Sequence, residues 1–165
     1  MRHGKGVQTH PNGTRYEGQW FEDKMHGTGI KIWTNGNVYK GEWLNDKRHG
    51  LGTKTWKDGM SYTGEWREHK RCGYGVKEWP SGVKYEGEWE DNQREGKGLQ
   101  RWPSGAKYDG NWHDHKMDGK GTLTCPDGAI YEGEWWEDKR YGRGTLTCPD
   151  GTKLSGEWLD DIYIK

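Results

Sequence analysis

The chain has 165 residues, and Val, Ile, Leu and Phe make up about a tenth of them, less than an ordinary hydrophobic core requires. Its 12 Trp and 9 Tyr can take over that role, because each aromatic side chain buries on the order of 150 to 250 Å². The 26 basic residues balance the 26 acidic ones, so no net field attracts nucleic acid, which is excluded as an expected partner.

The sequence carries no sign of a membrane or secretory location. No apolar run approaches the ~20 residues that a spanning helix needs, and the start, MRHGKG, lacks the apolar stretch of a secretory signal. Cys72, Cys125 and Cys148 make an odd number of thiols in a chain that needs no disulfide staples. We therefore expect a soluble, cytoplasmic protein with reduced cysteines.

A repeat of 23 residues starts in the first residues and continues without insertion or deletion. One column holds Tyr16, Tyr39, Tyr62, Tyr85, Tyr108 and Tyr131, with Leu154 in the seventh place. Four residues later stand Trp20, Trp43, Trp66, Trp89, Trp112, Trp135 and Trp158. All 28 glycines fall into four columns of seven, so each glycine has a defined place in the repeat.

Each repeat contains a turn sequence between a G-x-G segment and the Tyr column. The turns are P-N-G, T-N-G, K-D-G, P-S-G, P-S-G, P-D-G and P-D-G, which favour a type I turn followed by a left-handed glycine. With Thr34, Asn35 and Gly36 as this three-residue loop, the predicted pairs are Lys31 with Tyr39, Gly29 with Gly41 and Gly27 with Trp43.

This register distributes the side chains between two faces of the hairpin. Tyr39, Trp43 and Trp33 share one face, and we expect Gly27 and Gly29 to leave room there for the indole rings. The alternate positions point to the other face, which should be polar and wet: Glu17, Glu42, Glu65, Glu88 and Glu134 with Lys40 and Thr63.

The predicted fold class is all-β, a single elongated twisted antiparallel sheet of seven tandem 23-residue β-hairpins, forming a ribbon with a groove. We expect one array over residues 1–165, with about fourteen strands. The hairpins are placed approximately at 3–20, 26–43, 49–66, 72–89, 95–112, 118–135 and 141–158. No segment has the spacing of an amphipathic helix, so the aromatic face is expected to be a partly open groove.

Variants of Y-E-G-E-W followed by a K-R-H-G-x-G segment, as in residues 16–29 and 39–52, resemble the membrane occupation and recognition nexus (MORN) repeat over essentially the whole chain. The resemblance implies a curved all-β scaffold of cytoskeletal, ciliary or membrane-associated assemblies, often dimeric and often holding a partner segment in its groove. Phospholipid binding has also been proposed for this family. Cys72, Glu95, Asp118 and Tyr141 depart from the His of the H-G pair, and Leu154 departs from the Tyr column.

An uncovered aromatic stripe usually marks an interaction surface, so we expect a helix or an extended peptide of a partner protein to bind there. The predicted groove residues are Trp33, Trp56, Trp79, Trp102, Tyr39, Tyr62, Tyr85, Tyr108 and Tyr131. Cys125 and Cys148 continue the Trp33 column as smaller side chains, which should leave the groove more open there.

Two other surfaces are alternative binding sites. A basic loop edge could meet anionic phospholipid, although nearby acidic residues favour a mixed-charge, solvated edge. Its residues are Lys24, Lys47, Arg48, Lys70, Arg71, Lys139 and Arg140. The first and last strands are edges that could pair with another copy, giving a homodimer or a longer assembly.

The pattern indicates no catalytic site, cofactor or metal, and the chain is not expected to be an enzyme. His3, His26, His49 and Cys72 form a column, but equivalent residues on successive hairpins lie about 10 Å apart, which is too far to share one zinc ion. A zinc shared between chains through His113, His115 or a Cys stays an alternative. Every candidate base or nucleophile is a repeat-column residue without a pocket around it.

Overall fold

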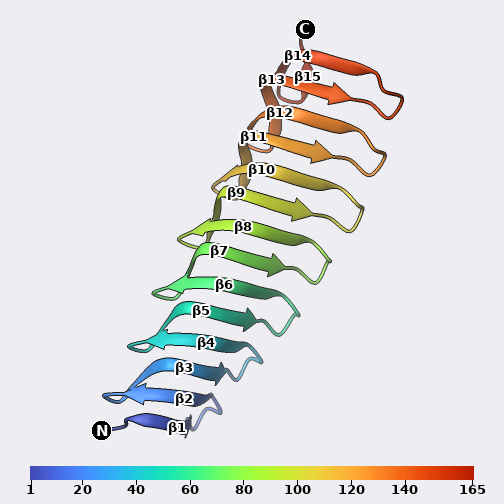
Figure 1. Ribbon diagram of the computed structural model, residues 1–165. Coiled ribbons are helices and arrows are strands. Elements are labelled where there is room, and N and C mark those ends of the chain that lie inside the picture. Colours follow the sequence, from blue (N-terminus) through green and yellow to red (C-terminus); the bar gives the residue numbers. More distant parts are fainter. The chain divides into compact units, whose positions relative to one another are not determined.

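The computed structural model describes residues 1–165 and consists of strands and turns in one antiparallel sheet, with the strands in sequence order (Figure 1). It contains no helix that could cross a membrane. The strands are β1 (Gly4–Thr9), β2 (Arg15–Phe21), β3 (Lys24–Ile32), β4 (Val38–Leu44), β5 (Lys47–Thr55), β6 (Ser61–Arg67), β7 (Lys70–Glu78), β8 (Lys84–Glu90), β9 (Gln93–Arg101), β10 (Lys107–His113), β11 (Lys116–Thr124), β12 (Ile130–Trp136), β13 (Lys139–Thr147), β14 (Lys153–Leu159) and β15 (Ile162–Tyr163). The predicted all-β, antiparallel fold class is confirmed.

The chain divides into two compact units. The first comprises residues 1–80 and 90–92, and the second comprises residues 81–89 and 93–165. The chain has one strand more than the fourteen that the repeats predict, because the second unit ends in β15, which pairs with the end of β14. In this short strand the Tyr163 ring packs against Trp158 at 5.3 Å between ring centroids.

The long turns within the hairpins confirm the predicted loop and register. Trp33 N–H donates to the Asn37 carbonyl at 2.9 Å, and Gly36 N–H donates to the Trp33 carbonyl at 2.9 Å. Gly36 has φ of 86°, the left-handed conformation that a glycine accepts without strain. The pairs that follow are those predicted: Lys31 with Tyr39, Gly29 with Gly41 and Gly27 with Trp43.

The connections between hairpins are two-residue turns in which both residues have positive φ, as in a type I′ turn. In the turn between β4 and β5, Asn45 and Asp46 have φ of 49° and 68°. Hydrogen bonds to the preceding repeat offset this strain, because Asp46 N–H donates to the Met25 carbonyl at 3.0 Å and Asp46 Oδ1 accepts Met25 N–H at 2.8 Å. Each such turn therefore ties one hairpin to the one before it.

The core is a ladder of tyrosine and tryptophan rings. Tyr39 is fully buried and Trp43 is 3% exposed. The Tyr39 ring meets Trp43 and Trp66 edge to face, at 5.1 and 5.5 Å between centroids. Its hydroxyl donates to the Glu42 carbonyl at 3.0 Å, and Trp43 Nε1 donates to the Gly29 carbonyl at 3.3 Å. These large side chains are thus buried with their polar atoms satisfied, as buried Tyr and Trp require.

Glycine is required where a tyrosine ring packs closely against the backbone of the neighbouring strands. A Cβ atom added to Gly52 would lie 2.5 Å from Tyr39 Cζ, and one added to Gly41 would lie 2.6 Å from the Leu51 carbonyl oxygen. The expectation that indole rings occupy this space is wrong. A register shift between Gly18 and Gln19 places Gly27 at a bulge with φ of 57°, where an added Cβ would meet the Gln19 side chain and not an indole.

The aromatic face is covered, although no helix is present. The Arg48 guanidinium lies 4.4 Å from the centre of the Trp66 ring, and its Nη2 donates to the His69 carbonyl at 3.1 Å. The same column contains Arg2, Met25, Arg71, Arg94, Met117 and Arg140. The prediction of an open aromatic groove over the Tyr and Trp columns is therefore wrong, because arginine stems and the short turns close that surface.

We expect Gly52→Ala to lower the free energy of unfolding by about 1 to 3 kcal/mol, because the methyl group overlaps the Tyr39 ring. Gly6 is the matched control: it has the same place in the first repeat, where no tyrosine precedes it, and its added Cβ meets only Trp20, at 3.3 Å or more. Urea unfolding of both variants measures the difference. Equal losses for Gly6→Ala and Gly52→Ala would contradict the role of the ring.

Arg48→Met should change the free energy of unfolding little, since Met25 and Met117 hold the same place in their own repeats. Arg48→Ala should cost about 1 to 2 kcal/mol, because it removes both the stacking on Trp66 and the covering stem. Arg67→Ala, at an exposed position of the neighbouring strand, serves as the control. Thermal unfolding monitored by tryptophan fluorescence distinguishes these cases, and a Met variant as unstable as the Ala variant would refute the covering role.

His69 makes one short turn sensitive to acid. Its Nδ1 accepts Arg48 N–H at 3.2 Å, and burial together with the Arg48 charge lowers the pKa of His69 below its ordinary value of 6.5. Below pH 6.5 the unfolded chain therefore binds more protons than the folded chain, so stability is complete above this pH and falls as the pH falls.

We expect His69→Asn to lose less stability than the native chain between pH 7.5 and pH 5. Asn92 shows that an amide suits this position, because its Oδ1 accepts Arg71 N–H at 3.0 Å. Urea unfolding at the two pH values tests this, with the exposed His10→Asn as the control. The same pH dependence in all three proteins would show that His69 does not carry the effect.

Candidate functional site

The tyrosines predicted to line a partner groove lie in the core. Tyr39, Tyr62, Tyr85 and Tyr108 have no exposed surface and Tyr131 is 1% exposed, so the prediction that they meet a partner is wrong. Burial raises the pKa of Tyr131 to about 12, the Arg140 charge opposing it in part. These side chains hold the hairpins together, and a binding surface has to be sought elsewhere.

The Trp33 column remains partly accessible beside the core. Trp33, Trp56, Trp79 and Trp102 are half-buried, as are the free thiols of Cys125 and Cys148 in the same column. In the first unit lysines lie between the indoles: Lys54 Nζ is 4.5 Å from the Trp56 ring centre and 5.9 Å from that of Trp33. Burial, with the Arg48 and Arg71 charges, lowers the pKa of Lys54 to about 8. We call Trp33, Trp56 and Trp79, together with Lys31, Lys54 and Lys77 beside them, the Trp–Lys row.

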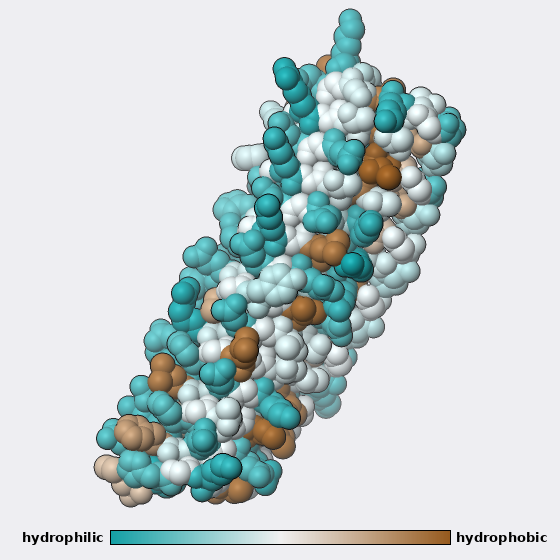
Figure 2. All heavy atoms as spheres, in the orientation of Figure 1, coloured by the Kyte–Doolittle hydropathy of each residue, from teal (hydrophilic) through white to brown (hydrophobic).

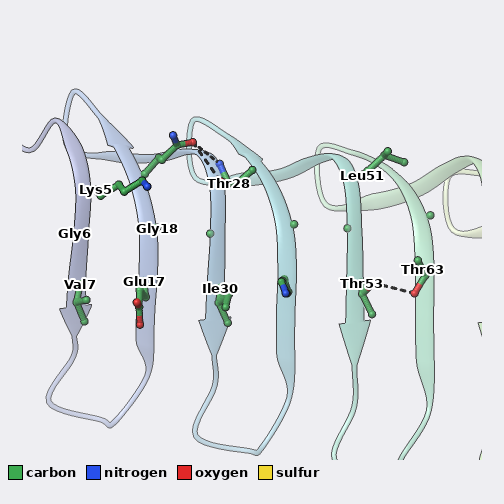
Figure 3. A pocket seen from close by; sticks show the side chains of 16 residues that line it. Lys5, Gly6, Val7, Glu17, Gly18, Thr28, Ile30, Leu51, Thr53 and Thr63 are labelled. Carbon is green, nitrogen blue, oxygen red and sulfur yellow. Dashed lines mark hydrogen bonds between the residues drawn. The ribbon is translucent and has the colours of Figure 1, made fainter.

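The opposite face of the sheet is hollowed in the first unit, over about 780 Å³. Figure 3 shows glycines along the floor between two lines of side chains. The floor is Gly6, Gly18, Gly29, Gly41, Gly52 and Gly64; one bank is Val7, Glu17, Ile30, Lys40, Thr53 and Thr63; the other is Lys5, Gln19, Thr28 and Leu51. We call this hollow the glycine channel, and no other element covers it.

The same glycines create the channel and the core. Directly opposed glycines such as Gly29 and Gly41 form one row across the strands, and an added Cβ on them would point at the tyrosine rings. The neighbouring residues therefore point away from the core and form the banks. Their positions are fixed in part by the bulges, because Gln19 Oε1 accepts Thr28 N–H at 2.7 Å and Glu42 Oε1 accepts Leu51 N–H at 2.9 Å.

The channel face is polar as predicted, but it also has apolar side chains that the sequence analysis missed. Val7 and Leu51 are 58% and 62% exposed, and Ile30 is half-buried. Figure 2 shows hydrophobic side chains as separate patches among hydrophilic ones on the face in view. Apolar residues recurring in the column of Val7 and Ile30, on a face expected to be wet, were the signal that could have indicated this site.

The second unit has its own section of glycine channel, with a volume of about 890 Å³ and charged banks. Its floor contains Gly110, Gly121 and Gly133. One bank contains Asp109, Thr122 and Glu132, and the other contains Lys97, Asn111, Lys120, Glu134 and Arg143. At the positions where the first unit has Val7, Ile30 and Leu51, this unit mainly presents groups that bind by charge or hydrogen bonding.

The basic loop edge is largely engaged within the chain. Lys47 pairs with Glu68 at 2.8 Å, Lys70 with Asp91 at 3.2 Å and Lys139 with Asp160 at 3.2 Å. The guanidinium groups of Arg48, Arg71 and Arg140 lie against aromatic rings of the core, and Lys24 is exposed. This edge alternates in charge, as expected for a solvated mixed-charge surface, and offers few cations to a lipid headgroup.

The histidines do not form a metal centre. No three His, Cys, Asp or Glu side chains of residues 1–165 come together in a way that could hold a metal ion. His113 Nδ1 instead contacts Glu95 Oε1 at 2.6 Å, and this carboxylate raises the pKa of His113. His3 and His26 pack against Phe21, with ring centroids 5.3 and 5.6 Å apart. The alternative of a zinc shared between chains stays a prediction.

Several solved structures resemble this fold, among them two domains of SAS-4 proteins. One is the TCP domain of SAS-4 (dCPAP) of Drosophila melanogaster in complex with a proline-rich motif of Ana2 (dSTIL), with a TM-score of 0.57 and 16% identity over 94% of this chain and 85% of that chain. The other is the TCP10c domain of Drosophila melanogaster Sas-4, with a TM-score of 0.53 and 17% identity over 94% and 93%. At this identity the likeness concerns the fold alone.

A family model for the repeat matches the chain seven times. The matched residues are 1–15, 16–38, 39–61, 62–84, 85–107, 108–130 and 131–153. No curated protein is significantly similar to the chain. The repeat model nevertheless covers residues 1–153, and its seven matches follow the 23-residue period of the hairpins. The chain therefore belongs to the MORN repeat family.

Proposed function

We propose that this chain is a non-enzymatic scaffold that binds an extended segment of a partner protein in the glycine channel. The observation that carries the proposal is the channel itself, an uncovered hollow of about 780 Å³ with Val7, Ile30 and Leu51 on its banks. Exposed apolar side chains gathered along a hollow are typical of interaction surfaces. The cytoskeletal or ciliary setting that the family resemblance implies is part of the same proposal.

The width of the channel favours an extended ligand over a helix. Its banks are formed by residues two apart on one strand, such as Lys5 and Val7, about 6.6 to 6.8 Å apart along the backbone. An α-helix with its side chains is ~10 to 12 Å wide and would rest on the rims. Apart from β1, which is an edge strand, the floor strands are paired on both sides, so the ligand cannot be added between them as another strand and must be held by its side chains.

The solved relatives support an extended ligand. The SAS-4 domain of this fold is in complex with a proline-rich motif, and such motifs adopt extended polyproline II conformations. We propose the same class of ligand for this chain.

The Trp–Lys row is a second candidate surface for the same function. Half-buried indoles recur once per hairpin at Trp33, Trp56 and Trp79, and aromatic rows of this kind bind proline-rich segments. The row lies on the core side of the sheet, so substitutions can separate it from the channel.

A panel of proline-containing twelve-residue peptides, displayed as a library, provides the test. We expect selected peptides to bind at least about tenfold more weakly to Ile30→Arg/Thr53→Arg, because two long cations fill the channel and cost more than about 1.4 kcal/mol of binding. Trp56→Ala should change their affinity little.

Isothermal titration calorimetry measures these affinities, and far-UV circular dichroism checks that both variants stay folded. The opposite pattern, with loss only in Trp56→Ala, would move the site to the Trp–Lys row. Peptides that bind the native chain and both variants equally would refute binding by either surface.

A further inference from the structure

Resting on the proposed function, we propose that the channel of the second unit binds a polyproline II segment in which an acidic and a basic residue each recur at every third position. Three features of the second unit support this ligand: the spacing of the hairpins, the bare glycine floor and four charged side chains that face the channel.

The spacing of the repeat matches one turn of a polyproline II helix. Equivalent residues on successive hairpins, such as Lys97 and Lys120, lie two strands apart, or roughly 9.6 Å at ~4.8 Å per strand. A polyproline II helix advances ~3.1 Å per residue with three residues per turn, or about 9.3 Å per turn. A β-strand repeats its side-chain direction every ~6.6 to 6.8 Å and loses this register after one hairpin.

The glycine floor suits a ligand that needs no backbone hydrogen bonds from the sheet. The backbone of Gly110 and Gly121 is engaged in the sheet, since each glycine pairs with the glycines of both neighbouring strands. A polyproline II segment has no internal hydrogen bonds, and its outer side stays in water above an open channel. Proline has no N–H group to leave unsatisfied against this floor.

The banks supply the charge pattern. Lys97 and Lys120 stand on one bank, and Asp109 and Glu132 stand on the other. All four side chains are exposed, and none takes part in an ion pair within the chain. The other charged groups on these banks are already engaged, because Glu134 accepts the backbone N–H of Arg143, and Arg143 pairs with Glu157.

The floor and the two charged banks match the three faces of one polyproline II helix. Proline residues face the glycine floor, acidic residues face Lys97 and Lys120, and basic residues face the opposite carboxylates. Both residue orders, Pro-Glu-Lys and Pro-Lys-Glu, present these faces, because reversing the direction of the chain in the channel exchanges the two sides. At the equivalent positions the first unit carries Lys5, Thr28 and Leu51 on one bank and Glu17, Lys40 and Thr63 on the other, so cations do not recur opposite carboxylates there.

Fluorescent peptides with four repeats of Pro-Glu-Lys or of Pro-Lys-Glu test the proposal on the full chain. The control peptide has the same composition, but its charges are permuted so that none recurs at three-residue intervals. We expect at least one periodic peptide to bind about tenfold more tightly than the control in fluorescence anisotropy, and to weaken as salt screens the contacts. Equal binding of periodic and permuted peptides would overturn the proposal.

Substitutions then assign the binding to the channel. Lys97→Glu/Lys120→Glu should weaken the periodic peptide about tenfold or more, because two attractions become repulsions. Lys57→Glu makes the same kind of charge reversal at an exposed turn outside the channel and should leave the affinity unchanged. Unchanged binding in the double variant would overturn the proposal even if the periodic peptide binds.

The two proposals fail differently. If library peptides depend on Ile30 and Thr53 while neither periodic peptide binds, the charge-reading proposal is wrong and the scaffold function stands. If no channel substitution in either unit affects any bound peptide, the proposed function fails as well.

Discussion

The structure depends on one packing arrangement, a tyrosine ring packed against a pair of facing glycines. The Tyr39 ring rests on Gly41 and Gly52, its hydroxyl reaches the Glu42 carbonyl, and tryptophans from two strands meet its edges. Any side chain on either glycine would displace the ring, because a Cβ atom there overlaps ring or backbone atoms. A core one ring thick can hold a single sheet because the arginine column and the short turns cover it.

The same glycines divide the sheet into two faces with separate roles. On the core side they admit the rings, and on the other side they leave bare backbone between two banks of side chains. The core columns are nearly uniform along the chain, whereas the bank positions differ from repeat to repeat, from Val7 and Ile30 to Asp109 and Glu132. Changes on the banks cost little stability because these residues are not packed in the core. The repeat thus supplies a constant spacing, and the banks supply selectivity.

Much of the fold could be predicted because its signals are local. The turn at residues 34–36 determines the pairing of Gly29 with Gly41, and the confirmed register follows from turn chemistry alone. The short turns were harder to predict from the sequence. Asn45 and Asp46 adopt positive φ, and this conformation is supported by hydrogen bonds to the preceding hairpin. The covering arginines were missed for a related reason: Arg48 stacks on a ring 18 residues further along, in a contact between hairpins.

The amino-acid sequence by itself determined the repeat, the strands, the long turns and the register, because period and turn preference act within a few residues. It also determined which residues share a face. Only the tertiary structure decided which of the two faces is closed. A bulge between Gly41 and Glu42 shifts the pairing of β4 with β5 of the next hairpin. Arg48 of β5 and the turn at Asp46 lie over the aromatic side through contacts between hairpins. The candidate binding surface therefore lies on the glycine channel, opposite the tyrosine column that the sequence indicated.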